Sequence, residues 1–106
     1  MDCDIVFMTP NMLNIRYCEE TAEAHKEYAK VTAKSQNEGK MDRFMDAARE
    51  VCAENNVQIC DCYAKWKKMS EMGVDTTLLL DNYINHPTRG MHIFFAECIF
   101  DTLIFG

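Results

Sequence analysis

The stretch Asp4-Ile5-Val6-Phe7-Met8-Thr9-Pro10-Asn11 decides the fold class of this chain. Its first part, residues 4–8, is a continuous apolar run that predicts a short buried β-strand. The Thr-Pro-Asn that follows is typical of a turn. Because apolar residues occupy both faces of this strand, we expect both faces to be covered, as in a parallel sheet packed between helices.

Helical segments and a second strand follow in alternation. We expect, in chain order, a helix over residues 19–34, a polar connection over 35–40, a helix over 41–54, a strand over 57–60, a helix over 62–72, a loop over 75–85 and a helix over 93–105. Asp61 is placed to cap the helix over 62–72, and Gly73 is placed to end it.

Apolar residues at helical spacing indicate which faces pack inward. In the helix over 41–54 we expect the inward residues to be Met41, Phe44, Met45, Ala48, Val51 and Cys52. In the helix over 62–72 they are Tyr63, Trp66 and Met69. In the final helix they are Ile93, Ala96, Phe100, Leu103 and Ile104. The run Leu78-Leu79-Leu80 is expected to anchor the preceding loop.

This order of elements predicts an α/β fold with parallel crossovers in a single domain, residues 1–106. Two strands leave a parallel sheet with open edges, so we expect the chain to correspond to the last part of a doubly wound sheet, with N-terminal strands missing. An alternative is a non-catalytic α/β module that forms a homo-oligomer by pairing its exposed sheet edge with that of a second copy.

Composition excludes several classes of partner. The chain has 17 acidic and 11 basic residues and a net charge of −6, which disfavours binding to nucleic acid. The densest basic cluster, Lys65, Lys67 and Lys68, is expected to be the solvated face of a helix. No apolar run is long enough to span a membrane, and the first residues lack the basic region of a signal peptide. We therefore expect a cytoplasmic protein without a membrane partner.

Six cysteines are expected to remain reduced, with four of them packed inside apolar patterns: Cys3, Cys52, Cys60 and Cys98. The spacing of Cys60 and Cys62 is narrower than in zinc sites, so packing at a strand end is the better interpretation of this pair. We expect no metal and no other cofactor.

The run Asn82-Tyr83-Ile84-Asn85-His86-Pro87-Thr88-Arg89-Gly90-Met91-His92 carries the main functional candidate. Pro87 stiffens the loop and the helix after it anchors the loop, so His86 is held in a defined position. One interpretation makes His86 a catalytic base at a loop-to-helix junction, and the other makes it a loop histidine that donates to a backbone carbonyl.

Three segments resemble, in the same order, the C-terminal half of the SGNH (GDSL-type) hydrolases. Residues 5–11 resemble a late strand and its Thr-Pro-Asn loop, residues 41–67 resemble a helix, strand and Asp-x-Tyr turn, and residues 85–92 resemble the final His-Pro loop. The resemblance covers most of the chain. It implies a partial flavodoxin-like α/β/α sandwich and the ester hydrolase class, which includes serine esterases, lipases and acylhydrolases.

The resemblance also implies site residues. His86 would be the general base that takes a proton from a serine hydroxyl, and Asp81 would be the acid that orients it. Asp81 stands five residues before His86, whereas Tyr83 occupies the position of the usual acid, so a backbone carbonyl could orient the imidazole instead. The only serines, Ser35 and Ser70, lack a Gly-Asp-Ser context. We therefore expect the chain to be inactive alone, and whether it is an enzyme stays open.

Overall fold

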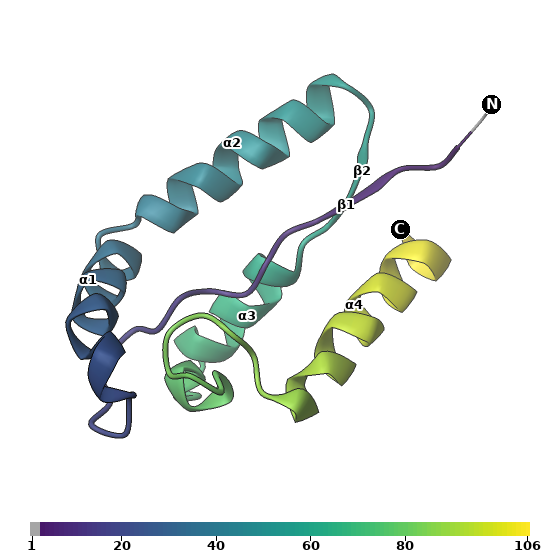
Figure 1. The fold of residues 1–106 in the computed structure, drawn as a ribbon. Helices are drawn as coiled ribbons and strands as arrows, with labels where there is room; N and C mark the ends of the chain where they lie inside the picture. Colours follow the sequence, from purple (N-terminus) through teal and green to yellow (C-terminus); the bar gives the residue numbers. More distant parts are fainter. Residues whose placement is uncertain (1–2) are drawn as a thin grey trace.

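The computed structural model describes residues 3–106 and shows a mixed α/β chain (Figure 1). Its elements are β1 (Val6–Met8), the 3-10 turn η1 (Glu23–His25), α1 (Lys26–Asn37), α2 (Lys40–Glu54), β2 (Gln58–Cys60), α3 (Cys62–Glu71), the 3-10 turns η2 (Thr76–Leu79) and η3 (Arg89–Met91), and α4 (His92–Phe105). The predicted α/β class is confirmed.

The two strands pair in parallel. Val6, Phe7 and Met8 of β1 lie opposite Gln58, Ile59 and Cys60 of β2. The intervening chain, with α1 and α2, forms the crossover that a parallel pair requires. In Figure 1, α2 lies on one side of the strands and α4 on the other, and both helices contact β2.

Helix α3 begins and ends as its local sequence predicts. The Asp61 carboxylate accepts a hydrogen bond of 3.2 Å from the backbone N–H of Ala64, which satisfies a free donor of the first turn. Gly73 takes a φ of +100°, a conformation that favours glycine and stops the helix. Tyr63 and Trp66 are buried on the inner face of α3, as expected.

The core is built around Trp66, which has no exposed surface. It shares a buried cluster with Met12, Met45, Tyr63 and Leu80, which come from the segment after β1, from α2, from α3 and from the loop after η2. Its ring meets that of Phe94 edge-on at 5.5 Å and stacks on Phe95 at 6.0 Å, so α4 is joined to the same core.

A second buried cluster joins the sheet to α4 through cysteines. Cys60, Cys62 and Cys98 pack together, and all six cysteines of the chain are free thiols. Cys3, which we expected to pack inside an apolar pattern, is exposed. It precedes β1, where the described chain offers no covering element.

Helix α1 begins seven residues later than predicted. The Thr21 backbone N–H and hydroxyl both donate to the carbonyl of Cys18, at 3.0 and 2.6 Å, and this local turn competes with helix formation. Helix α1 then extends to Asn37, and α2 begins at Lys40. The connection is therefore shorter than predicted and turns at Gly39, whose φ is +80°.

The expectation that both faces of β1 are covered is wrong. Ile5 is 66% exposed, and Phe7 and Met8 are each 43% exposed. The reason is that the two helices beside the sheet, α2 and α4, pack mainly on β2 and leave the faces of β1 partly uncovered.

The predicted inner face of α4 is also wrong. Ile93, Ala96, Phe100, Leu103 and Ile104 are all exposed, whereas Cys98 is buried and Phe94 and Phe95 pack on Trp66. This helix is apolar on nearly every side, so periodicity alone cannot select a face. On α2 the same prediction holds for Met45 and Cys52, which are buried, and fails for Phe44 and Val51, which are exposed.

Two leucines of the predicted apolar anchor test the core assignment. Leu80 is 1% exposed and Leu78 is 52% exposed. We expect Leu80→Ala to lower the free energy of unfolding by about 2–5 kcal/mol, because it leaves a cavity beside Trp66. Leu78→Ala should change it by less than about 0.5 kcal/mol. Urea denaturation of both variants measures this, and equal losses would contradict the assignment.

Candidate functional site

The loop that carries Asp81 and His86 is a closed turn. A backbone bridge joins Leu80 to Pro87, and the N–H of Asp81 donates to the carbonyl of His86 at 2.6 Å. The buried side chains of Leu80 and Ile84 fix this turn to the body of the protein. The loop is therefore held at both ends and in its middle.

Asn82 organises the interior of the loop. Its side-chain oxygen accepts hydrogen bonds of 3.0 Å from the backbone N–H groups of Ile84, Asn85 and His86. Its amide nitrogen donates to the side-chain oxygen of Asn85 at 2.8 Å. Tyr83 takes a φ of +60°, which is uncommon for a residue with a side chain and marks a tightly constrained turn.

The structure brings Asp81 and His86 together through their main chains. Both side chains are exposed to solvent. In the part of the chain described, no hydrogen bond joins the Asp81 carboxylate to the His86 imidazole, and no backbone carbonyl accepts from that ring. The backbone of His86 is thus fixed on both sides while its ring is open to a reaction partner.

The segment after β1 lies beside this loop. The Asn11 side chain donates to the carbonyl of Asn85 at 3.0 Å, and the backbone N–H of Asn14 donates to the carbonyl of Ile84 at 2.9 Å. Sequence reasoning singled out the Thr-Pro-Asn turn and the His-Pro loop but did not predict that they touch. The asparagine-rich composition of both segments is the only local signal of this contact.

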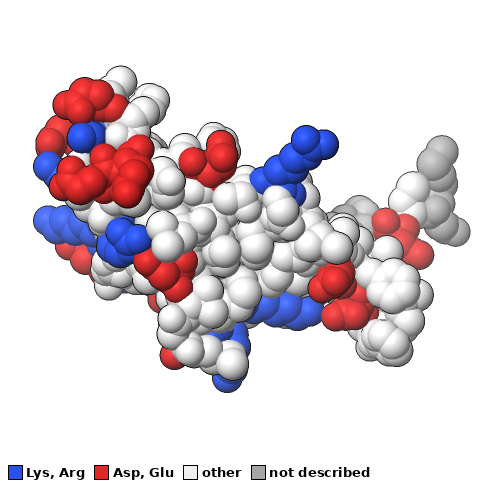
Figure 2. Space-filling model, turned by 90° about the horizontal axis from the view of Figure 1, so that it is seen from below, with Lys and Arg blue, Asp and Glu red and all other residues white. Residues whose placement is uncertain are grey.

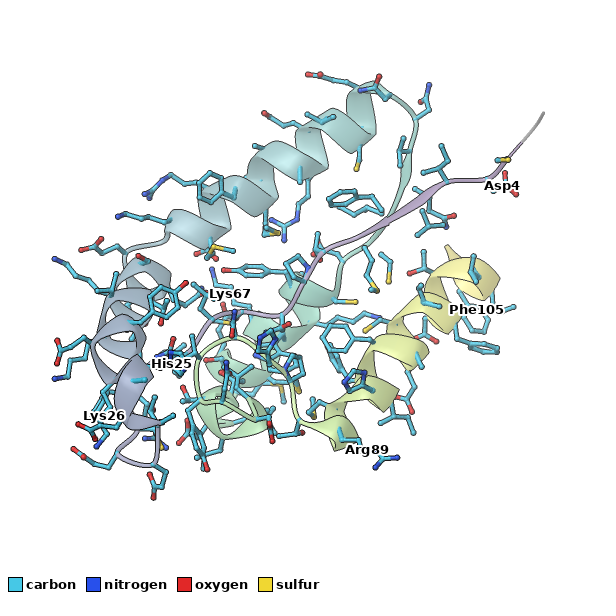
Figure 3. All side chains as sticks on the ribbon, in the orientation of Figure 1. Asp4, His25, Lys26, Lys67, Arg89 and Phe105 are labelled. Atoms are coloured by element: carbon cyan, nitrogen blue, oxygen red, sulfur yellow. The ribbon has the colours of Figure 1, made fainter. Side chains whose placement is uncertain are left out.

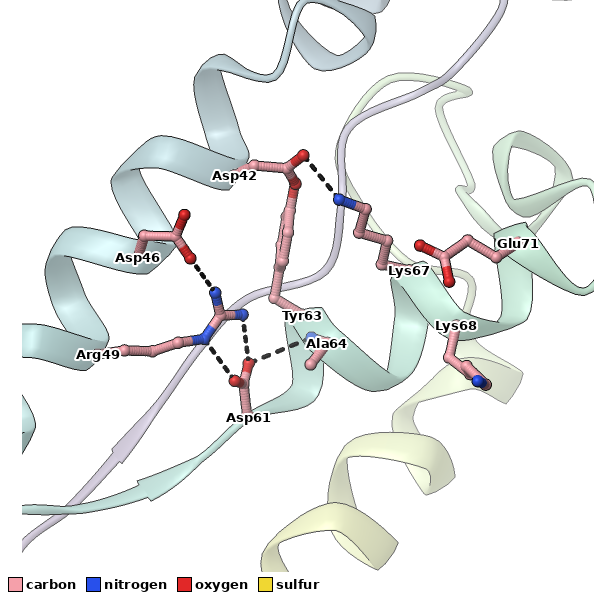
Figure 4. Close-up of a pocket in the computed structure, with 9 residues that line it drawn as sticks. All are labelled: Asp42, Asp46, Arg49, Asp61, Tyr63, Ala64, Lys67, Lys68 and Glu71. Atoms are coloured by element: carbon pink, nitrogen blue, oxygen red, sulfur yellow. Dashed lines mark hydrogen bonds and ion pairs between the residues drawn. The ribbon is translucent and has the colours of Figure 1, made fainter.

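A polar pocket of about 480 Å³ opens beside the carboxyl ends of the two strands (Figure 4). Thr9 directly follows β1 and Asp61 directly follows β2, and the Thr9 hydroxyl donates to the Asp61 carboxylate at 2.9 Å. The same hydroxyl accepts from the N–H of Tyr63 at 2.9 Å. The guanidinium of Arg49, on α2, donates hydrogen bonds to both carboxylate oxygens of Asp61, at 2.7 and 3.2 Å.

On the other side of the pocket, a chain of hydrogen bonds joins side chains of α1, α2 and α3. The Gln36 amide donates to the Tyr63 hydroxyl, the Tyr63 hydroxyl donates to Asp42, and the Lys67 ammonium also donates to Asp42, each at 2.7 Å. Lys67 is therefore held in an ion pair, whereas we expected a solvated cation. Sequence reasoning missed this network because its members are far apart along the chain.

The two carboxylates are held in their charged forms. Burial raises the pKa of Asp61, but hydrogen bonds from Arg49, Thr9 and the backbone of Ala64 outweigh that cost, so the net pKa lies below its usual value. For Asp42, burial also raises the pKa, but hydrogen bonds from Lys67 and Tyr63 outweigh this effect, so its net pKa lies below the usual value.

The Tyr63 hydroxyl is held in its neutral form. Burial raises its pKa, and the nearby Asp42 carboxylate adds to this, so the phenol remains a donor. The part of the pocket around Asp42 and Asp61 is therefore built from satisfied pairs, whereas the side chains of Lys68 and Glu71 line its other end with no ion pair or hydrogen bond among the described residues. We interpret the paired part as the polar scaffold that fixes α2 and α3 at the carboxyl edge of the sheet.

Within residues 3–106, no three His, Cys, Asp or Glu side chains converge closely enough to bind a metal ion. None of the helices in this range combines the length and apolar character needed to cross a bilayer. Comparison with known proteins found no matching family, no similar curated protein and no similar solved structure. The chemistry of the site therefore has to be argued from its own geometry.

The depressed pKa of Asp61 predicts acid sensitivity. Because its folded pKa lies below the unfolded value of about 3.9, its contribution to stability is present above that value and is lost as the pH falls through the folded pKa. We expect the free energy of unfolding to fall below about pH 4. Asp61→Asn keeps a capping oxygen but should flatten this fall in urea titrations. The exposed Glu97→Gln is the control, and an equal change in its acid profile would contradict the prediction.

We expect the Asn82 side chain to keep the backbone of the histidine loop rigid. Asn82→Ala removes the acceptor shared by three backbone donors and should increase amide hydrogen exchange at residues 84–86 by at least roughly tenfold, the equivalent of about 1.4 kcal/mol. Asn82→Asp keeps an oxygen in the same place and should preserve the protection. Faster exchange in both variants would show that the side-chain oxygen is not the cause.

Proposed function

We propose that this chain is an ester hydrolase-like protein of the SGNH type, which carries the catalytic base but not the serine nucleophile. The observation that supports this proposal is the contact of Asn11 with Asn85 at 3.0 Å, which joins the turn after β1 to the histidine loop. The three segments of the resemblance thereby meet at the carboxyl edge of parallel strands, where α/β proteins bind their ligands.

In this proposal His86 is the general base. Its imidazole accepts the proton of an attacking hydroxyl and returns it to the leaving alcohol. The hydrogen bonds of Asn82 and Asp81 with the backbone of His86 fix the main chain that carries the ring before a substrate binds, which lowers the entropic cost of reaction. The exposure of His86 leaves room for the hydroxyl to approach.

Asp81 is proposed as the residue that orients the imidazole. Its N–H is bonded to the carbonyl of His86, so both side chains start from the same closed turn. The serine and the donors of an oxyanion hole would come from a further polypeptide segment. The unpaired edge of β1 in the described part of the chain supports a flavodoxin-like sheet that continues beyond this strand.

A cytoplasmic location belongs to the same proposal. All six cysteines are free thiols, although the sulfur atoms of Cys60 and Cys62 lie only 3.8 Å apart. The thiols of Cys60, Cys62 and Cys98 pack together in the core, which suits cysteines that act as small buried apolar residues and stay reduced.

An activated ester tests the role of His86, because an imidazole can attack p-nitrophenyl acetate without a serine. We expect the intact protein to hydrolyse it faster than buffer does and His86→Ala to lose most of this excess. His92→Ala, at the exposed first residue of α4, should retain it. Release of p-nitrophenolate measures the rates.

Equal rates for the protein and both variants would reject His86 as a base in a reactive position. The Asp81→Asn variant separates the two ways of orienting the ring. A rate close to that of His86→Ala supports the carboxylate, and an unchanged rate rejects Asp81.

A further inference from the structure

The protein exposes more surface than a compact monomer of its size. Its accessible surface is 7104 Å², whereas a folded monomer of its 12.3 kDa mass exposes about 6,100 Å². Its radius of gyration is 15.0 Å, compared with about 13 Å for a compact domain of 106 residues. The excess of about 1,000 Å² is close to the roughly 800 Å² that each partner buries in a stable interface.

Much of the exposed apolar surface lies on the side of α4 that faces away from the core. This outer α4 face consists of Ile93, Ala96, Phe100, Leu103 and Ile104, all exposed to solvent. Figure 3 shows side chains projecting from α4 on both of its sides between Arg89, just before the helix, and Phe105 at its end. A helix that is apolar all round is normally buried all round.

Two charged residues border the outer α4 face, because Glu97 and Asp101 line one hollow with Ala96 and Phe100. Figure 2, which views the molecule from below, shows a central area without acidic or basic side chains and charged groups around its margin.

Beyond α4, Leu103 and Ile5 line one hollow together with polar residues such as Asp4 and Gln58. Ile5 is itself 66% exposed. The outer α4 face thus borders a mixed polar and apolar hollow beside β1.

The spacing of the outer α4 face matches that of a helix–helix seam. Ile93, Ala96, Phe100 and Leu103 follow one another at steps of three, four and three residues, as the a and d positions of a heptad do. Such a seam packs against another helix at a shallow crossing angle.

The seam of one copy is complementary to the same seam of a second copy that runs in the opposite direction. In an antiparallel pair centred on position 98, Ala96 of each copy lies opposite Phe100 of the other, and Ile93 lies opposite Leu103. The small alanine accommodates the large phenylalanine, so the two helices can approach closely. Cys98 itself points into the core and does not interfere.

We infer that two copies of this chain associate through their outer α4 faces, with the two helices antiparallel about a twofold axis. A twofold interface requires one surface that fits itself, and this seam has that property. The amount of surplus surface on each chain is also what a stable dimer needs. The inference does not depend on the role of His86.

Light scattering after size-exclusion chromatography tests the association. The intact protein should have twice its 12.3 kDa mass and dissociate on dilution. Phe100→Glu should weaken the dimer by roughly thirtyfold or more, as for a residue at the centre of an interface. Phe44→Glu is the matched control, because Phe44 is 65% exposed and Phe100 is 60% exposed. It should remain dimeric.

Circular dichroism checks that each variant is folded, and Leu103→Lys replaces Phe100→Glu if that variant unfolds. The inference would be overturned if the intact protein were a monomer at every concentration tested. A monomer that binds lipid vesicles or another protein would overturn it as well. It would equally be overturned if Phe44→Glu dissociated the dimer and Phe100→Glu did not.

A size exchange tests the antiparallel register. Phe100→Ala should weaken the dimer by leaving a cavity, and Ala96→Phe should weaken it by placing two large rings together. The double variant restores one large and one small side chain at each contact and should recover most of the affinity. A double variant as weak as the summed single effects would reject this register.

Discussion

The packing of α4 on Trp66 is the contact on which the remaining structure depends. Trp66 has no exposed surface, and its ring meets Phe94 and Phe95 at 5.5 and 6.0 Å. Through Met12 and Leu80, the same cluster reaches the turn after β1 and the start of the histidine loop. Helices α2, α3 and α4 and the start of the histidine loop therefore meet at one buried aromatic group. Its indole N–H has no partner among the described residues, so this packing also offsets a desolvation cost of about 1–3 kcal/mol.

Hydrogen bonds and ion pairs fix the orientation of the packed elements. The two hydrogen bonds from Arg49 to Asp61 and the bond from Thr9 to Asp61 join α2 to the ends of both strands. On the opposite side of the turn after β1, Asn11 and Asn14 hold the loop of His86. One short segment, residues 9–14, thus links the polar pocket to the histidine loop.

Local signals in the sequence were sufficient to predict the bounds of those elements whose ends are set by one or two residues. Asp61 and Gly73 define α3 because a cap and a left-handed turn act within a few residues. The inner face of α4 could not be predicted, since apolar side chains surround the helix. The face that is buried is the one that packs on Trp66, a residue distant in the sequence. The contacts of Arg49, Tyr63 and Lys67 were missed for the same reason. Asp81 and His86 were selected from the sequence as a side-chain pair, but the structure joins only their main chains, and the role of Asn82 in fixing the loop was not predicted.

The parallel pairing of β1 with β2 also has a consequence for folding. Thr9 and Asp61, which close the ends of the two strands, are 52 residues apart in the chain. Bringing them together costs loop entropy before any ladder bond forms, while α1 and α2 can form from local contacts. We therefore expect β1 to pair late, so that its apolar residues stay exposed while the helices form. Chaperones that recognise extended apolar peptides would find their target there, before the native state is complete.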